Sequence, residues 1–117
     1  MRGKVALITG SAKGLGKMTA LTLARSGCDV ALNYVHSRRE AEELRAVIEG
    51  LGVRSIAVQA DVSDTGQLEH LVAHVESELG SPDIVVNNAG PFIRERKRFS
   101  DYTQAEILSL IQGNLVG

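Results

Sequence analysis

The sequence predicts an α/β domain with an open, doubly wound parallel sheet in the strand order 3-2-1-4. Three observations predict this fold. Short apolar segments recur along the chain, helix-like segments separate them, and a glycine-rich turn directly follows the first apolar segment. The apolar segments are continuous rather than alternating, which is typical of parallel strands that are covered on both faces.

Four apolar segments are the candidate strands, at residues 5–8, 30–32, 56–58 and 84–86. Each is rich in valine, isoleucine, leucine or alanine and is bounded by turn-forming residues. Right-handed crossovers between such strands place the intervening helices on both faces of a parallel sheet. The chain of 117 residues is therefore expected to be one domain or part of one.

The first two helices are predicted from their end signals. The first is expected over residues 15–26, with Gly27 in the left-handed conformation that often ends a helix. The second begins at Ser37, which has capping-box spacing to Glu40, and ends near Gly50. Its expected buried stripe consists of Leu44, Val47, Ile48 and Leu51.

Two further helices are predicted after the second one along the chain. The third begins after Asp64 and ends at Gly80, just before Pro82. Its apolar residues share one face, and they are Leu68, Leu71, Val72, Val75 and Leu79. The fourth is indicated by Thr103 and Glu106, again at capping-box spacing.

Composition narrows the classes of function. The formal net charge of −1 gives no reason to expect binding to nucleic acid or to an anionic membrane. No apolar segment approaches the roughly 20 residues of a membrane helix.

The only cysteine, Cys28, excludes an internal disulfide, so a reducing compartment, the cytoplasm, is expected. His70 and His74 have metal-pair spacing but lie opposite the apolar stripe, so we expect no metal site.

A glycine-rich turn at residues 9–16 lies between the first strand and the first helix. Glycines allow the backbone to approach a pyrophosphate closely, and the free N–H groups of the helix N-terminus stabilise its negative charge. This context predicts a Rossmann-like dinucleotide-binding domain. The phosphate-binding candidates are Gly10, Ser11, Lys13, Gly14, Leu15 and Gly16.

The glycine spacing is Gly-x-x-x-Gly-x-Gly, and Asn87-Asn88-Ala89-Gly90 follows the fourth strand. Together these motifs resemble those of the short-chain dehydrogenase/reductase family, and the resemblance covers the whole chain. It implies that Asn87 ties the sheet together, whereas Asn88, Ala89 and Gly90 line the nicotinamide side of the cofactor.

The resemblance assigns further positions. It implies that Asp61 and Val62 meet the adenine, and that Asn114 is the catalytic-site asparagine of the family. Each also has a purely structural interpretation, since Asp61 could be a turn residue at a strand end and Asn114 a hydrogen-bonded amide at a helix end.

The choice of cofactor follows from charge. An acid at the end of the second strand would hold the ribose 2′-hydroxyl of NAD, but after Leu32 the first carboxylate is Glu40, inside the helix. Arg38 and Arg39 in the first turn of a helix are unfavourable unless an anion is near. Lys13 matches a basic position of NADP-preferring members of the family. We therefore expect NADP(H), with Ser37 and Arg38 at the 2′-phosphate. The alternative is that these cations are ordinary solvated side chains.

The segment 91–99 places four cations around one carboxylate and is flanked by phenylalanines. In the family this segment borders the active site, and members similar to 3-oxoacyl carrier-protein reductases receive an acidic carrier protein. The expected substrate is therefore a carbonyl compound, either a small molecule or a 3-oxoacyl thioester on such a carrier. A solvated surface loop is the alternative interpretation.

Family members carry a catalytic serine and a Tyr-x-x-x-Lys motif beyond the fourth helix. Tyr34 is followed at that spacing by Arg38, and Tyr102 by Glu106, so neither tyrosine matches. We expect residues 1–117 to be the N-terminal part of an NADP-dependent carbonyl reductase, truncated before the fifth strand and inactive alone. A non-catalytic NADP(H)-binding module or partner subunit is the alternative.

The fourth strand would then have an open edge. Unpaired backbone groups along residues 84–86 form a surface to which another strand can add. We expect the chain to form a homo-oligomer or to associate with a second polypeptide through this edge.

Overall fold

A computed structural model describes residues 2–88 of the chain. Strands and helices alternate along them, as the sequence predicts. In chain order they are β1 (Val5–Thr9), α1 (Gly14–Arg25), β2 (Asp29–Tyr34), α2 (Arg38–Gly50), β3 (Ser55–Gln59), α3 (Thr65–Glu78) and β4 (Ile84–Asn87). The predicted fourth helix, the segment 91–99 and three candidate site residues, Ala89, Gly90 and Asn114, lie outside the described residues.

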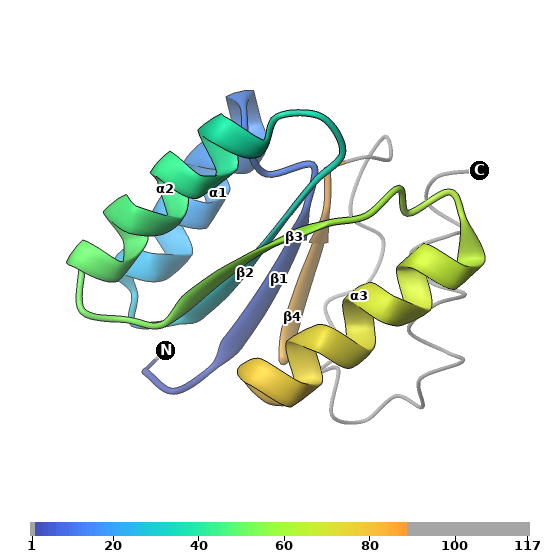
Figure 1. Ribbon diagram of the computed structural model, residues 1–117. Helices are drawn as coiled ribbons and strands as arrows, with labels where there is room; N and C mark the ends of the chain where they lie inside the picture. Colours follow the sequence, from blue (N-terminus) through green and yellow to red (C-terminus); the bar gives the residue numbers. More distant parts are fainter. Residues whose placement is uncertain (1, 89–117) are drawn as a thin grey trace.

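The four strands form one sheet in the order β3-β2-β1-β4, and every neighbouring pair is parallel. The predicted fold class and strand order are therefore confirmed. Helices α1 and α2 cover one face of the sheet and α3 covers the other (Figure 1). Because the strands are parallel, the turns that follow β1, β2 and β3 meet at one edge of the sheet, its carboxyl edge.

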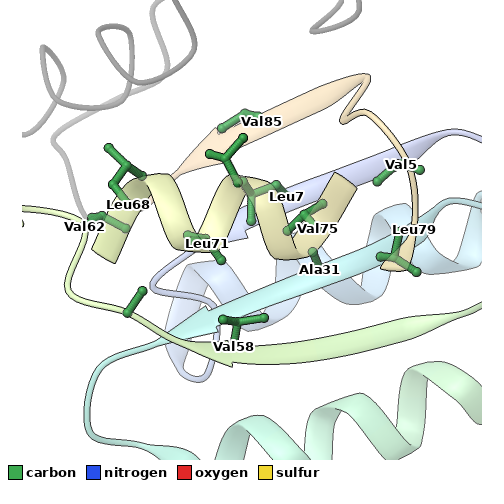
Figure 2. Packing of buried hydrophobic residues seen from close by; sticks show 12 residues of the cluster. Val5, Leu7, Ala31, Val58, Val62, Leu68, Leu71, Val75, Leu79 and Val85 are labelled. Atoms are coloured by element: carbon green, nitrogen blue, oxygen red, sulfur yellow. The ribbon is translucent and has the colours of Figure 1, made fainter. Parts of the chain in front are cut away.

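The face under α3 is a closely packed apolar core. Leu7, Ala31 and Val58 from three strands contact the buried side of α3 (Figure 2). All five residues of the predicted α3 stripe are buried, at most 7% exposed. Alternate strand residues such as Ala6 and Ile8 face the opposite core under α1 and α2. The sheet is therefore buried on both faces, which explains its continuous apolar strands.

Two of the four residues predicted for the buried stripe of α2 are exposed. Leu44 and Ile48 are buried, but Val47 is 55% exposed and Leu51 is 44% exposed. The buried face instead runs from Ala41 through Leu44 to Ile48, which lie three and four positions apart and therefore on one side of a helix. Val47 lies about 100° around the helix from Ile48, at the flank of this buried face, where its side chain is largely solvated.

The predicted capping box at the start of α2 does not form. Ser37 is the N-cap residue, but its side chain makes no capping hydrogen bond, and its backbone, with φ −94° and ψ 53°, is not extended. Asp64, the N-cap of α3, is extended and accepts a hydrogen bond from the backbone N–H of Gln67 at 3.2 Å. An extended N-cap backbone aims the side chain at the first turn, which explains the difference.

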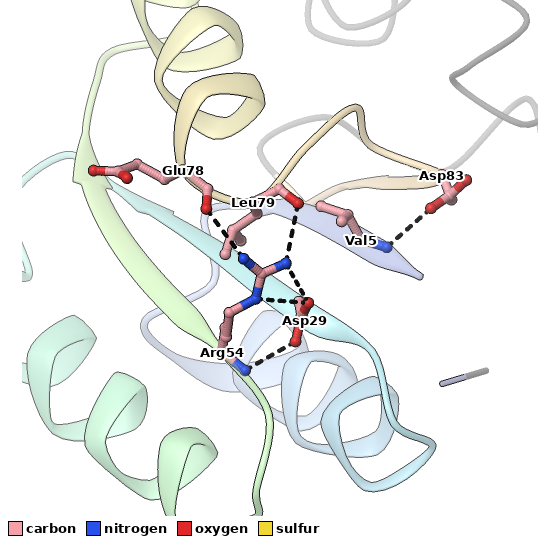
Figure 3. Close-up of polar contacts among 6 residues, drawn as sticks. All are labelled: Val5, Asp29, Arg54, Glu78, Leu79 and Asp83. Carbon is pink, nitrogen blue, oxygen red and sulfur yellow. Dashed lines mark hydrogen bonds and ion pairs between the residues drawn. The ribbon is translucent and has the colours of Figure 1, made fainter. Parts of the chain in front are cut away.

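Charged side chains join the elements at the amino edge of the sheet, far from the glycine-rich turn (Figure 3). The guanidinium of Arg54 donates to Asp29 Oδ2 at 2.9 and 3.1 Å and also to the backbone carbonyls of Glu78 and Leu79. On β1, the N–H of Val5 donates to Asp83 Oδ2 at 3.0 Å. These contacts fix the starts of β1, β2 and β3 and the end of α3.

The two neighbouring residues of α2 provide a test of this packing. Ile48→Val should lower the free energy of unfolding by about 1 kcal/mol, because it removes a methyl group from the core. Val47→Ala should change it by less than about 0.5 kcal/mol, because that side chain is largely solvated. Urea denaturation followed by circular dichroism measures both, and equal losses would contradict the observed orientation of α2.

Candidate functional site

The turn between β1 and α1 presents a helix N-terminus at the carboxyl edge of the sheet. Gly10 and Gly14 have φ of 60° and 58°, a left-handed conformation that glycine adopts without strain. Lys13 is the N-cap of α1, its side chain makes no capping hydrogen bond, and the first turn contains no acidic residue. The first N–H groups of α1 are therefore not capped by a side chain, and the positive end of the helix dipole can bind an anion.

Gly16 allows α1 to lie close to this turn. A Cβ atom at this position would lie 2.5 Å from the carbonyl oxygen of Gly10 and 2.9 Å from the Cα of Ser11. Both are backbone atoms that cannot move aside without changing the turn. Only a glycine fits here, which agrees with a turn shaped to admit a phosphate group.

Asn33, near the end of β2, supports the glycine-rich turn through hydrogen bonds of its side chain. Its side chain is buried, and Oδ1 accepts a hydrogen bond from the N–H of Gly10 at 3.3 Å. Nδ2 donates to the carbonyls of Val58 and Ala60 at 3.3 and 3.0 Å. The Ser11 hydroxyl bonds both backbone groups of Asn33, so the predicted phosphate ligand Ser11 is buried and acts first as a support.

Sequence reasoning missed the role of Asn33. The available signal was that Asn33, a polar residue, directly follows the apolar strand residues 30–32 with no turn residue between them. A buried amide needs several hydrogen-bond partners, and at the end of a strand these partners come from the adjacent turns.

A hollow of about 260 Å³ lies between the turn and the end of β2. It brings together Gly10, Lys13 and Ser37, three of the predicted cofactor residues. Its other lining residues are Ala12, Tyr34, Val35 and His36. None of the lining residues is acidic, so this hollow can accept an anion without repulsion from its walls. Arg38 follows Ser37 at the start of α2 and is exposed.

The cations near this hollow differ in their contacts. Arg39 pairs with Glu43 at 3.2 Å in an exposed contact along α2. Within residues 2–88, Lys13 and Arg38 make no side-chain hydrogen bond or ion pair. Lys13 and Arg38 are therefore available to a bound anion, whereas Arg39 already has a partner.

Asp61 and Val62 follow β3 at the same edge. Asp61 Oδ1 accepts hydrogen bonds from the N–H and the hydroxyl of Ser63 at 3.0 and 2.6 Å. These bonds lower the pKa of the Asp61 carboxyl, and the nearby His36 contributes in the same direction. Asp61 thus forms a turn contact. The Val62 side chain is buried in the core under α3 and does not face this edge.

The two asparagines after β4 have different environments. Asn87 is buried and accepts a hydrogen bond from the Thr9 hydroxyl at 2.7 Å, which ties β4 to β1 as the resemblance implies. Asn88 Nδ2 is buried and has no hydrogen-bond partner among residues 2–88, and it lies 3.2 Å from the Cβ position of Gly16. A buried donor without an acceptor costs about 1–3 kcal/mol, so this amide is suited to a ligand oxygen.

These features together fit a dinucleotide. An uncapped helix N-terminus, a cradle that a Cβ atom would fill and an orphaned amide donor all lie around one turn. Lys13 lines the adjoining hollow and Arg38 follows its lining residue Ser37, both without a side-chain partner among the described residues. A pyrophosphate and a further anionic group about one ribose away would satisfy all of them.

Other candidate residues have structural environments. His70 is exposed on α3 beside His74, with ring centroids 6.0 Å apart. No group of three or more metal-ligating side chains occurs within residues 2–88. Cys28 is fully buried, and this burial raises the pKa of its thiol. Over the same residues, no helix is both long and apolar enough to span a membrane.

Comparisons with known proteins agree with this geometry. The family model for short chain dehydrogenase matches residues 4–117. Hydroxynaphthalene reductase arp2 of Aspergillus fumigatus is 43% identical over 90 residues, which cover 77% of this chain and 33% of that protein. The 3-oxoacyl-[acyl-carrier-protein] reductase FabG of Staphylococcus aureus is 44% identical over 87 residues, 74% of this chain and 35% of that protein. The chain thus spans about a third of the length of these curated relatives.

Comparison with a solved structure agrees with these sequence comparisons. A short chain dehydrogenase from Burkholderia cenocepacia in complex with NADP superposes with a TM-score of 0.74 and 40% sequence identity. The match covers 95% of this chain and 44% of that one. The fold, the glycine-rich turn and the family match lead to one conclusion: the chain belongs to the short-chain dehydrogenase family.

Proposed function

We propose that this chain binds NADP(H) and supplies the cofactor-binding part of an oxidoreductase that reduces a carbonyl group. The observation that carries the proposal is the hollow at the end of β2, which has no acidic lining residue. Lys13 lines it and Arg38 follows its lining residue Ser37, and neither cation has a side-chain partner in the part of the chain that the structure describes. A 2′-phosphate is the group that distinguishes NADP from NAD, and cations at this position favour it.

The proposed contacts follow the order of the turns. The first turn, with Gly10, Ser11, Gly14, Leu15 and Gly16, cradles the pyrophosphate. Lys13, Ser37 and Arg38 hold the 2′-phosphate. Asp61 and Val62 meet the adenine, Val62 through its backbone because its side chain is buried. Asn88 donates to the cofactor from the nicotinamide side, with Ala89 and Gly90 beside it.

The reduced nicotinamide, when bound, supplies a hydride to the carbonyl carbon. The chain itself positions that ring, and Asn114 is the residue we propose at the catalytic site.

The proposed substrate is a 3-oxoacyl thioester on a carrier protein. Two observations support it: the 44% identity to a relative named for that substrate, and four cations in the segment 91–99, namely Arg94, Arg96, Lys97 and Arg98. An acidic carrier protein would be attracted to such a segment. We further propose a cytoplasmic location and association through the edge of the sheet at β4.

The cofactor preference can be measured by calorimetric titration of the purified chain. NADPH should bind at least about tenfold more tightly than NADH, because a phosphate paired with two cations contributes more than about 1.4 kcal/mol. The Lys13→Ala/Arg38→Ala double variant should lose most of this preference while retaining its affinity for NADH.

Arg39→Ala is the matched control. It removes a neighbouring cation that already pairs with Glu43, so it should leave the preference within about twofold of the original. Equal affinities for NADPH and NADH in the unmodified chain would contradict the proposal.

A pair of glycine substitutions tests the phosphate cradle. Gly16→Ala should abolish measurable NADPH binding and lower the free energy of unfolding by about 1–3 kcal/mol, because its Cβ atom would collide with two backbone atoms. Gly50→Ala, on α2, meets nothing within 4 Å and should leave stability unchanged or raise it by up to about 1 kcal/mol. Unimpaired binding by the Gly16→Ala variant would exclude this turn as the phosphate site.

A further inference from the structure

The Asn33 side chain reaches two turns at the carboxyl edge, and both turns belong to the proposed cofactor site. Its Oδ1 accepts a hydrogen bond from the N–H of Gly10, in the turn after β1, at 3.3 Å. Its Nδ2 donates to the carbonyl of Ala60, which begins the turn after β3, at 3.0 Å. These turns are the positions proposed above for the pyrophosphate and the adenine, so one amide connects two parts of the site.

The amide fits its partners in only one orientation. A second carbonyl, that of Val58, accepts from Nδ2 at 3.3 Å, so both amide hydrogens have acceptors. With the amide reversed, its oxygen would face two carbonyl oxygens and its nitrogen would face the Gly10 N–H. Asn33 is 2% exposed, so water has little access to replace a lost partner. Either turn can therefore shift only by breaking its own hydrogen bond or by moving the amide that holds the other turn.

Each of the two turns has a further hydrogen bond that limits its freedom. The N–H of Asp61, in the same peptide group as the Ala60 carbonyl, donates to Gln67 Oε1 at 2.8 Å. In the turn after β1, the N–H of Ser11 donates to the Asn33 carbonyl at 3.1 Å. Asn33 thus joins two well-held segments, and a contiguous chain of hydrogen bonds of this kind can transmit a change from one site to another.

We propose that Asn33 is a positioning residue that couples the pyrophosphate and adenine subsites: it does not contact the cofactor, but a group bound at one turn keeps the other turn in its binding position through this amide. The inference rests on the proposed function and adds cooperation between two parts of the cofactor to it. A ligand that contacts both turns then binds more tightly than its separate parts predict, because the second turn is already ordered when the first is occupied.

The experiment is a set of calorimetric titrations of the full chain with ADP, which carries an adenine and a diphosphate, and with inorganic pyrophosphate, which is too small to span both turns. The measured quantity is the ratio of the pyrophosphate dissociation constant to the ADP dissociation constant. Asn33→Ala removes the side-chain hydrogen bonds to both turns. It should lower this ratio by about five- to thirtyfold, within the range that is typical of coupling between two sites.

Ser55→Ala is the matched control. Ser55 joins the same two strands at their amino ends, where its buried hydroxyl donates to the Val30 carbonyl at 2.9 Å. The variant loses a buried hydrogen bond between β2 and β3 but leaves both turns as they are, so it should keep the ratio within about twofold of the original. A smaller folded fraction weakens the apparent binding of both ligands by the same factor and does not change their ratio.

A second measurement needs no substitution of Asn33, so it also decides the matter if Asn33→Ala does not fold. Amide NMR spectra of the unmodified chain follow the side-chain signals of Asn33 and the backbone signal of Asp61 during titration with pyrophosphate. Both should shift and saturate together with binding, because the Gly10 N–H and the Ala60 carbonyl are bonded to the same amide. Shifts confined to the turn after β1 would overturn the coupling.

The outcomes separate this inference from the function on which it rests. A lowered ratio in Asn33→Ala with an unchanged ratio in Ser55→Ala supports the coupling. If Asn33→Ala keeps the original ratio while the unmodified chain prefers NADPH to NADH, the coupling is wrong and the proposed function stands. If the unmodified chain binds neither ADP nor NADPH, the proposed function is wrong, and this inference with it.

Discussion

The buried amide of Asn33 is the contact on which the cofactor edge of this structure depends. It joins three segments that are far apart in the sequence: the turn after β1, the end of β2 and the end of β3. Because the amide has both an acceptor and a donor, it bonds a backbone N–H on one side and two carbonyls on the other. An aspartate here would place a carboxylate oxygen against those two carbonyls, so only a neutral amide suits these partners.

The two edges of the sheet are stabilised in different ways. The amino edge is held by charged side chains, chiefly Arg54 with Asp29, whose contacts reach from β2 to the end of α3. The carboxyl edge is held by glycines and neutral amides, and of the cations beside it Lys13 and Arg38 have no side-chain partner within residues 2–88. The ion pair between Arg54 and Asp29 therefore lies at the edge opposite the glycine-rich turn, so an anion bound at that turn does not disturb it.

Much of the fold could be predicted from the sequence because the signals are local. Continuous apolar segments gave the strands, and the spacing of Leu68, Leu71 and Val75 gave the buried face of α3. The exposure of Val47 could not be predicted, because it depends on how α2 is rotated about its axis on the sheet. The missing cap at Ser37 depends on the backbone of the connection after β2, which no residue pattern specifies.

In the candidate site, too, features with local sequence signals could be predicted and features that depend on tertiary contacts could not. The glycine-rich turn was identified from spacing, since each glycine acts within a few residues of the next. The support from Asn33 was missed because its partners lie 23 to 27 residues away in the chain and come together only in the folded sheet. Asn88 was placed by resemblance, whereas its unpartnered buried nitrogen became visible only in three dimensions.

The burial of Cys28 has a practical consequence. The chain has one thiol, which lies directly before β2 in the core under α1, and its burial disfavours the reactive thiolate. An alkylating reagent can therefore modify the native protein only when the junction between α1 and β2 opens. The rate of alkylation, followed by mass spectrometry, would report how often this part of the molecule unfolds locally, without any engineered label.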